Sequence, residues 1–343
     1  MKNFRLLIII ILMVPLACKK EPVRVSEEPV AFRPTCIEDS WVTGTTFYGA
    51  KSLNNTSNIP FSLVYGNKIY VFDAIQDEVR SYTGSGWDSI ASAVPFANYQ
   101  RPNFGFVIGN KGYLGNINEN QLNHPFYEYD FATNSWEGKA SFPGERRLAA
   151  SAACFAVGSK GYVVGGLGEI NSLASTFRDT WAYSPADNSW TQKADVPLAN
   201  RTTNATGFSA NNKGYMVGGM YVTENSTLNL KQLMEYDTLA NSWTAKTVFP
   251  GVGRYNIAVF VINGTPYAGG GRRYATFYKD FYKYNVGSDT WTQVKDITVS
   301  NPTVFGFTLS GKGYVEVVNT NSNPNFLMKY TPRNCIPPIS PNM

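Results

Sequence analysis

The sequence predicts an all-β fold, a ring of six four-stranded antiparallel sheets of the kind called a β-propeller. The first observation is a strand tyrosine that recurs six times at intervals of 43 to 53 residues. The second is a tryptophan that recurs six times at intervals of 46 to 54 residues. A constant internal layout with a period near fifty residues indicates one supersecondary unit repeated along the chain. The recurring residues are Tyr70, Tyr113, Tyr162, Tyr215, Tyr267 and Tyr314, and Trp41, Trp87, Trp136, Trp190, Trp243 and Trp291.

The first half of each unit reads as a hairpin of two short strands. Its clearest copies are residues 157–166, 211–219 and 263–271, in which a tight turn leads to the tyrosine and then to a run of glycines. A run of small and β-branched apolar residues precedes each turn. Two such runs joined by a tight turn predict a hairpin, and glycines at the strand end permit close backbone approach.

The second half of each unit reads as another hairpin. Tyr129, Tyr183, Tyr236 and Tyr284 are each followed seven residues later by a tryptophan. The intervening turns fall at Asn-containing sequences such as residues 132–134, and asparagine is a favoured turn residue. Each unit therefore supplies four antiparallel strands.

This unit resembles the kelch repeat, whose marks are the double glycine, the Tyr-Asp strand and the following tryptophan. The resemblance covers residues 36–335 and is strongest in the middle three units. The first unit departs from it, with Gly-Ser-Gly-Trp at residues 84–87, and the sixth has Val-Glu-Val-Val at the glycine position, residues 315–318. The resemblance implies that the recurring Gly, Tyr and Trp residues build the fold and are not a site.

The phase of the repeat predicts how the ring closes. Trp41 precedes any complete hairpin, whereas residues 300–331 supply three strands with no tryptophan after them. We expect the strand around Trp41 to complete the last blade, which gives six blades. The same phase brings Cys36 and Cys335 to one turn and predicts a disulfide between them. Cys154 lies in an apolar run and is expected to be a buried thiol.

The N-terminal residues predict export and a lipid anchor. Residues 1–17 combine a basic start with an apolar run that is too short to span a bilayer, as in a secretory signal peptide. The ending Leu-Ala-Cys at Cys18 resembles the lipobox of bacterial lipoproteins, although Pro15 departs from that pattern. Residues 18–35 read as a flexible tether and residues 336–343 as a tail. The Lys-Lys-Glu tract at residues 19–21 resembles the charged signals that follow the lipidated cysteine in surface lipoproteins of Bacteroidetes-like bacteria. These resemblances imply an outer-membrane lipoprotein of the cell envelope, periplasmic or surface-exposed.

One face of the ring is the expected binding site. An arginine stands just before the innermost strand of four blades, at Arg101, Arg147, Arg201 and Arg254. Four guanidinium groups around one rim would favour carboxylates through paired hydrogen bonds. In the alternative interpretation, each arginine pairs with an acceptor of a neighbouring blade and stabilises the ring. Long connections at residues 167–178, 220–231 and 271–279 would add to the rim the residues Arg272, Tyr274, Glu169, Tyr221 and Glu224.

Several kinds of chemistry are excluded by composition. The chain has one histidine, His124, expected on the surface in a polar loop, so a kelch copper oxidase with two histidine ligands cannot be assembled. Serine–histidine and zinc hydrolases are similarly disfavoured, and no cofactor is expected. Without residues 1–17 the chain carries 28 basic and 25 acidic residues and no basic stripe, which argues against nucleic acid as a partner.

Two functions remain open. The first is a monomeric, non-enzymatic binding module for an anionic glycan, a peptide or a protein at the arginine-rimmed face. The second is a mutarotase or epimerase of an acidic sugar such as N-acetylneuraminate, because the chain is similar to exported kelch mutarotases that use a glutamate with an arginine. In that case Glu169 or Glu224 would act beside Arg201.

Overall fold

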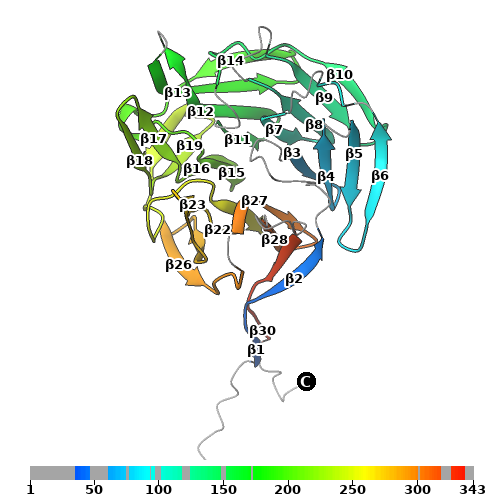
Figure 1. Cartoon of the computed structure of the whole chain (residues 1–343), viewed down its shortest axis with the longest axis vertical. Helices are drawn as coiled ribbons and strands as arrows, with labels where there is room; N and C mark the ends of the chain where they lie inside the picture. The colour runs from blue at the N-terminus through cyan, green and yellow to red at the C-terminus, as the bar shows by residue number, and fades with distance from the viewer. Residues whose placement is uncertain are drawn as a thin grey trace, which may run out of the picture. The chain divides into compact units, whose positions relative to one another are not determined.

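The computed structural model describes residues 35–46, 61–74, 77–92, 94–96, 102–117, 124–147, 152–170, 173–299, 302–317 and 326–336. Six four-stranded antiparallel sheets within Ile37–Asn334 form the blades of a propeller (Figure 1). This confirms the predicted all-β, six-bladed fold. Among the described residues, no helix is long and apolar enough to span a membrane.

Each blade runs from an innermost strand outward. Blade 1 contains β3 (Phe61–Tyr65), β4 (Lys68–Asp73), β5 (Glu78–Tyr82) and β6 (Trp87–Ser92). Blade 2 contains β7 (Phe104–Ile108), β8 (Lys111–Gly115), β9 (Phe126–Asp130) and β10 (Ser135–Gly138). Blade 3 contains β11 (Ala153–Val157), β12 (Lys160–Ile170), β13 (Leu173–Ser184) and β14 (Ser189–Lys193).

The remaining blades follow the same order. Blade 4 contains β15 (Thr206–Ala210), β16 (Lys213–Val217), β19 (Leu233–Asp237) and β20 (Ser242–Ala245). Blade 5 contains β21 (Ala258–Ile262), β22 (Thr265–Gly269), β25 (Phe281–Asn285) and β26 (Thr290–Val294). Blade 6 contains β27 (Pro302–Leu309), β28 (Lys312–Val317), β29 (Phe326–Thr331) and the N-terminal β2 (Ser40–Thr46).

The ring closes through the first and last parts of the propeller, as the repeat phase predicted. β2 pairs antiparallel with β29, and Trp41 stands opposite Tyr330. This is the register of Trp190 opposite Tyr183 inside blade 3. A strand from the start of the chain therefore completes a blade begun at its end.

The glycine before the strand tyrosine lets neighbouring blades approach closely. A Cβ at Gly161 would lie 2.0 Å from the ring of Phe106, on the innermost strand of the preceding blade. Gly214 meets Phe155 of its preceding blade at the same calculated distance. Buried side chains of the described residues accordingly form hydrophobic clusters between neighbouring blades, such as the one that joins Tyr162 of blade 3 to the blade 4 core. The glycine before the strand tyrosine therefore serves the packing of neighbouring blades, because only glycine leaves room for the phenylalanine ring of the preceding blade.

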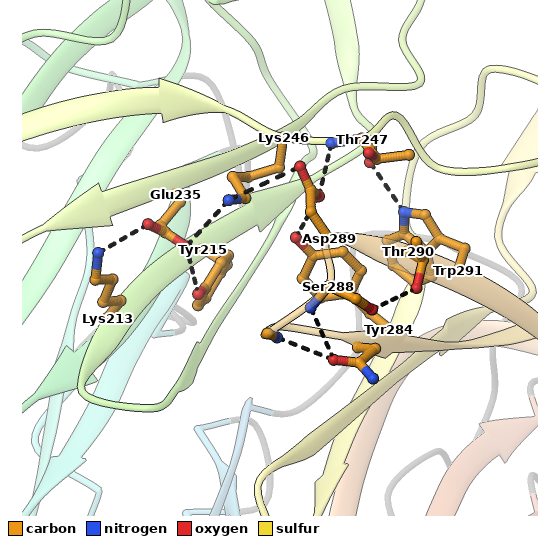
Figure 2. Close-up of polar contacts among 12 residues, drawn as sticks. Lys213, Tyr215, Glu235, Lys246, Thr247, Tyr284, Ser288, Asp289, Thr290 and Trp291 are labelled. Atoms are coloured by element: carbon orange, nitrogen blue, oxygen red, sulfur yellow. Dashed lines mark hydrogen bonds and ion pairs between the residues drawn. The ribbon is translucent and has the colours of Figure 1, made fainter.

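A hydrogen-bonded clasp also joins neighbouring blades, and Figure 2 shows the one between blades 4 and 5. Asp289, at positive φ in the turn of blade 5, accepts hydrogen bonds from the Tyr284 hydroxyl (2.6 Å) and from the Thr247 N–H (2.9 Å). The Trp291 indole N–H donates to the Thr247 carbonyl at 2.9 Å. Thr247, in the linker after blade 4, is therefore held through both its N–H and its carbonyl group.

The same clasp recurs in blades 3, 4 and 6 and explains the Tyr, Asn and Trp of those units. Asn188 with Trp190 holds Ala140, and Asn241 with Trp243 holds Ala194. At ring closure, Asp39 accepts from the Lys295 N–H at 2.6 Å, and the Trp41 indole donates to the Lys295 carbonyl at 2.8 Å. The N-terminal strand therefore makes for blade 6 the contacts that the outermost hairpins of blades 3 to 5 make with the linker before their own blade.

The long connections of blades 3 to 5 contain strand structure that was not expected. β12 and β13 continue as a hairpin beyond the blade 3 sheet, with Glu169 opposite Ala174. Blade 4 carries a separate hairpin of β17 (Met220–Thr223) and β18 (Ser226–Asn229), and blade 5 a short one of β23 (Arg272–Arg273) and β24 (Thr276–Phe277). A 3-10 turn, η1 (Leu198–Asn200), precedes blade 4.

The two cysteines proposed to form a disulfide lie in paired strands. β1 (Thr35–Ile37) and β30 (Asn334–Ile336) form a two-stranded sheet, with one cysteine in each strand. This pairing brings the two backbone segments together, which a disulfide requires. Cys154 is a free thiol, and burial raises its pKa to about 12.

Candidate functional site

We define the loop face as residues 194–205 and 246–257, which lead into blades 4 and 5, with the connections at 166–170, 173–178, 218–232 and 270–280. Backbone hydrogen bonds bind these segments to one another. Thr203 and Met220 exchange two bonds of 2.8 Å, and Tyr255 and Arg272 exchange two of 3.0 Å. Side chains in these segments therefore stand on a connected backbone framework.

Arg147, which leads into blade 3, is buried rather than open to a ligand. Its side chain is 1% exposed, and its guanidinium meets both carboxylate oxygens of Asp179, at 2.6 and 2.7 Å. Nε donates to the Gly165 carbonyl at 2.9 Å, and the Phe177 ring lies 4.1 Å from the guanidinium carbon. Burial lowers the pKa of Arg147, and the Asp179 carboxylate opposes that shift.

Arg254, which leads into blade 5, repeats this arrangement. It is 1% exposed and bonds both oxygens of Asp280, at 2.5 and 2.9 Å. It also donates to the Gly270 carbonyl at 3.1 Å and lies against the Tyr278 ring at 4.0 Å. Both arginines serve an internal contact, as in the alternative interpretation, but their carboxylate and carbonyl partners belong to the blade that the arginine leads into and not to a neighbouring blade.

Blade 4 differs because it has no carboxylate at the position equivalent to Asp179 and Asp280. Gln232 stands four residues before Tyr236, where Asp179 and Asp280 stand four residues before the equivalent tyrosines. Gln232 exchanges hydrogen bonds with Asn200, at 3.1 and 3.0 Å.

Arg201 is consequently left on the loop face. Thr202 contacts the Gly218 carbonyl at 3.4 Å, the acceptor equivalent to the one that Arg254 uses. The Arg201 guanidinium lies 4.3 Å from the Tyr221 ring centre, hydrogen bonds the Tyr221 hydroxyl and is only partly buried. None of the carboxylates in the described ranges forms an ion pair with it. A guanidinium held by an aromatic ring keeps its remaining donors for an outside acceptor.

The other predicted rim residues lie in the blade 5 connection. Arg272 stacks over Tyr255 at 5.0 Å, and its Nε has no hydrogen-bond partner among the described residues. Tyr274 is 61% exposed and adopts positive φ at the tip of its hairpin, next to the Arg273 guanidinium. Arg101 lies outside the described residues.

The two candidate catalytic glutamates are exposed. Glu169 lies on the extension of β12, and Glu224 lies in the turn between β17 and β18. Neither forms an ion pair with Arg201 in the part of the chain that the structure describes. Within the same part, no group of three or more His, Cys, Asp or Glu side chains is placed to hold a metal ion.

His124 is buried, so its expected surface position was wrong. It is 9% exposed, because the following Pro125 leads directly into β9 and the ring packs 6.1 Å from Phe142. Nδ1 lies 3.1 Å from the Phe142 carbonyl, and Nε2 is buried with no hydrogen-bond partner among the described residues. Burial, with smaller effects from Arg147 and Arg146, lowers the His124 pKa below 6.5.

This shift predicts a loss of stability in weak acid. The folded-state pKa lies below the unfolded value, so the contribution is fully present above about pH 6.5 and is lost as pH falls toward the folded pKa. The slope is at most about 1.4 kcal/mol per pH unit for one group. Urea unfolding between neutral and mildly acidic pH should show this slope for the wild type and a flatter line for His124→Gln. Identical slopes for the two proteins would exclude His124 as the titrating group.

No family model matches the chain. Kelch-like protein 25 of Xenopus tropicalis is 30% identical over 123 residues, which cover 34% of this chain and 20% of that protein. Kelch-like protein 25 of Xenopus laevis is 29% identical over a match of equal extent. The chain therefore spans about a fifth of the length of these relatives.

A solved structure shows the same fold. The structure of YjhT aligns with a TM-score of 0.52 at 18% identity, covering 62% of this chain and 70% of that one. The chain is a kelch-type β-propeller. Its kelch residues serve the blade packing and the clasps described above, whereas the loop face carries contacts that differ between blades 3, 4 and 5.

Proposed function

We propose that this kelch propeller is an extracytoplasmic binding module that captures an anionic glycan, peptide or protein on its loop face. The carrying observation is the contrast between blades. In blades 3 and 5 the arginine is buried against an aspartate, whereas in blade 4 a glutamine replaces the aspartate and Arg201 stands over Tyr221. A guanidinium without an internal carboxylate favours an external one.

This proposal predicts that Arg201→Ala weakens ligand capture without unfolding the protein. Binding would be measured on arrays of sialylated glycans and acidic peptides, with thermal unfolding of the same samples. The matched control is Arg178→Ala, because Arg178 is 46% exposed but already pairs with Asp195 at 3.3 Å. Equal binding by wild type and Arg201→Ala would remove the basis of the proposal. A fall in midpoint that parallels the loss of binding would assign Arg201 to structure.

The mutarotase interpretation receives less support from the geometry. General acid–base catalysis needs a carboxylate within hydrogen-bond reach, directly or through one water, of the group it protonates. Glu169 and Glu224 are exposed, and neither pairs with Arg201 within the described ranges. A mutarotation assay with N-acetylneuraminate would favour this second function if the rate depended on Arg201 and one of the two glutamates.

The cellular setting of the module is also proposed from the sequence, and residues 1–34, which carry the signal and the lipidation site, lie outside the described residues. Cys18 would carry the lipid after removal of residues 1–17, and residues 18–35 would tether the propeller. A Cys36–Cys335 disulfide would tie the chain ends, worth about 3–5 kcal/mol in the chain-entropy model.

One peptide mass map of native protein from membranes tests both cysteine assignments. The expected map has a diacylated or triacylated N-terminal peptide beginning at Cys18 and a cross-linked peptide pair containing Cys36 and Cys335. An unmodified peptide that runs through Cys18 would contradict the anchor. Alkylated free thiols at Cys36 and Cys335 would contradict the disulfide.

A further inference from the structure

The hairpin β17–β18 stands apart from the blade 4 sheet, at the rim of the ring in Figure 1. Its two strands pair with Tyr221 opposite Leu228 and Val222 opposite Thr227. In an antiparallel pair, opposed residues alternate between hydrogen-bonded and non-hydrogen-bonded positions. The register therefore decides which backbone groups of each strand point away from the hairpin.

The outer edge of β17 is already occupied. The Val222 N–H donates to the Thr176 hydroxyl of blade 3 at 3.0 Å, and that hydroxyl donates to the Val222 carbonyl at 2.8 Å. Met220 is paired with Thr203 through both of its backbone groups. Val222 and Met220 thus direct their N–H and C=O groups away from β18, which makes their pairs with Thr227 and Asn229 non-hydrogen-bonded.

The outer edge of β18 is open at Thr227, whereas the carbonyl of Asn229 at its end lies against Gly253 of the linker into blade 5. By the same alternation, the N–H and C=O of Thr227 point away from β17, and neither has a hydrogen-bond partner in the described part of the chain. Natural edge strands are protected by charged side chains such as lysine, by proline, by a bulge or by very short length. β18 reads Ser-Thr-Leu-Asn, and of these protections it has only its short length. It is a short strand edge that a further strand could extend.

The side chains beside this edge give it a chemical preference. Leu228 is 57% exposed and lies on the same face of the hairpin as Tyr221, its cross-strand neighbour. Tyr221 carries the Arg201 guanidinium against its ring. Across the two strands, this face therefore runs from the aliphatic Leu228 to the aromatic Tyr221 and then to the cationic Arg201. A complementary segment would offer an apolar side chain to Leu228 and a carboxylate to Arg201.

We propose that the edge of β18 is a docking site for an extended segment of a partner protein, which adds a strand to the hairpin. The segment pairs its backbone with Thr227, sets an apolar side chain beside Leu228 and directs a carboxylate of the same face to Arg201. Strand addition of this kind takes affinity from main-chain hydrogen bonds and specificity from alternate side chains. The proposal deepens the proposed function, on which it rests for the role of Arg201, while the edge itself does not depend on that role.

The test uses a labelled threonine-rich peptide whose alternate positions carry valine and glutamate in turn. Two further versions carry N-methyl groups that block one or the other edge of the peptide strand. Binding is followed by fluorescence anisotropy to Thr227→Pro, Arg201→Gln and the control Leu239→Thr, whose parent side chain is 97% exposed in the blade 4 turn. Thr227→Pro removes an outward N–H, a position at which an edge strand accepts proline.

Strand addition predicts that one N-methylated peptide loses binding and the other keeps it. Thr227→Pro should weaken binding at least about tenfold, a difference of about 1.4 kcal/mol, while Leu239→Thr leaves it unchanged. Arg201→Gln should weaken binding and reduce its salt dependence. If Thr227→Pro has its effect and Arg201→Gln has none, the docking edge stands and the proposed anion site fails.

Three results would overturn the docking site. One is the absence of binding by the unmodified peptide at millimolar concentration. Another is equal binding by wild type and Thr227→Pro. The third is a concentration-dependent dimer in sedimentation that Thr227→Pro dissociates, because the occupant would then be a second copy of this chain.

Discussion

Trp41→Ala should lower the free energy of unfolding by about 3–5 kcal/mol, the usual cost of removing a buried aromatic side chain. Trp41 is 8% exposed and packs against Phe281 and Tyr330, with ring centres 4.8 and 5.0 Å away. Its indole N–H also holds the Lys295 carbonyl of the preceding linker. The substitution therefore removes core packing and half of the clasp that closes the ring. Urea unfolding followed by tyrosine and tryptophan fluorescence would measure it.

The control for this experiment is Val42→Ala, one residue along the same strand. Val42 is 51% exposed, so its truncation should change the free energy of unfolding by less than about 0.5 kcal/mol. Similar losses for the two variants would mean that β2 contributes through backbone pairing alone. A negligible loss for Trp41→Ala would contradict closure of the ring by the N-terminal strand.

Asp280→Ala should cost about 3–5 kcal/mol, because it leaves the Arg254 guanidinium buried without its carboxylate. Arg254 would retain hydrogen bonds to carbonyl groups, including Gly270, but no counter-charge among the groups that contact it now. Asp179→Ala should behave alike, since Asp179 supplies both oxygens to Arg147. Thermal and denaturant unfolding of each single variant would measure these losses.

The exposed pair Arg178–Asp195 gives the matched control. Its side chains are 46% and 30% exposed, so Asp195→Ala should cost no more than about 1 kcal/mol. An Asp280→Ala protein as stable as Asp195→Ala would show that Arg254 can leave the interior. That result would return Arg254 to the set of ligand-binding candidates.

The sequence predicted the blades because the recurring Gly, Tyr and Trp residues determine backbone geometry and packing. The phase of Trp41 against Tyr330 was sufficient to predict ring closure, since a clasp needs its tryptophan and tyrosine in one sheet. The fate of the arginines could not be predicted from their common position. Whether an arginine is buried depends on a residue about thirty positions further along the chain, four before the tyrosine of the third strand. That residue is Asp280 in blade 5 and Gln232 in blade 4, and only the structure shows that it contacts the arginine in one blade and not in the other.

Two other features escaped the sequence for physical reasons. His124 was assigned to the surface from its polar neighbours, whereas packing against Phe142 buries it. The β17–β18 hairpin was read as a loop because each of its strands has only four residues, and short strands without a buried face carry little periodic signal. Contacts between blades, such as Thr176 with Val222, supply the order that local sequence does not.

The central claim is that the repeat buries Arg147 and Arg254 and leaves Arg201 available. Limited modification of the native protein with phenylglyoxal, followed by peptide mapping, tests it without any knowledge of the ligand. Arg201 should react at a rate close to that of the exposed Arg178, while Arg147 and Arg254 stay protected until the protein unfolds. Equal protection of Arg201 and Arg254 would contradict the claim, and so would rapid modification of all three.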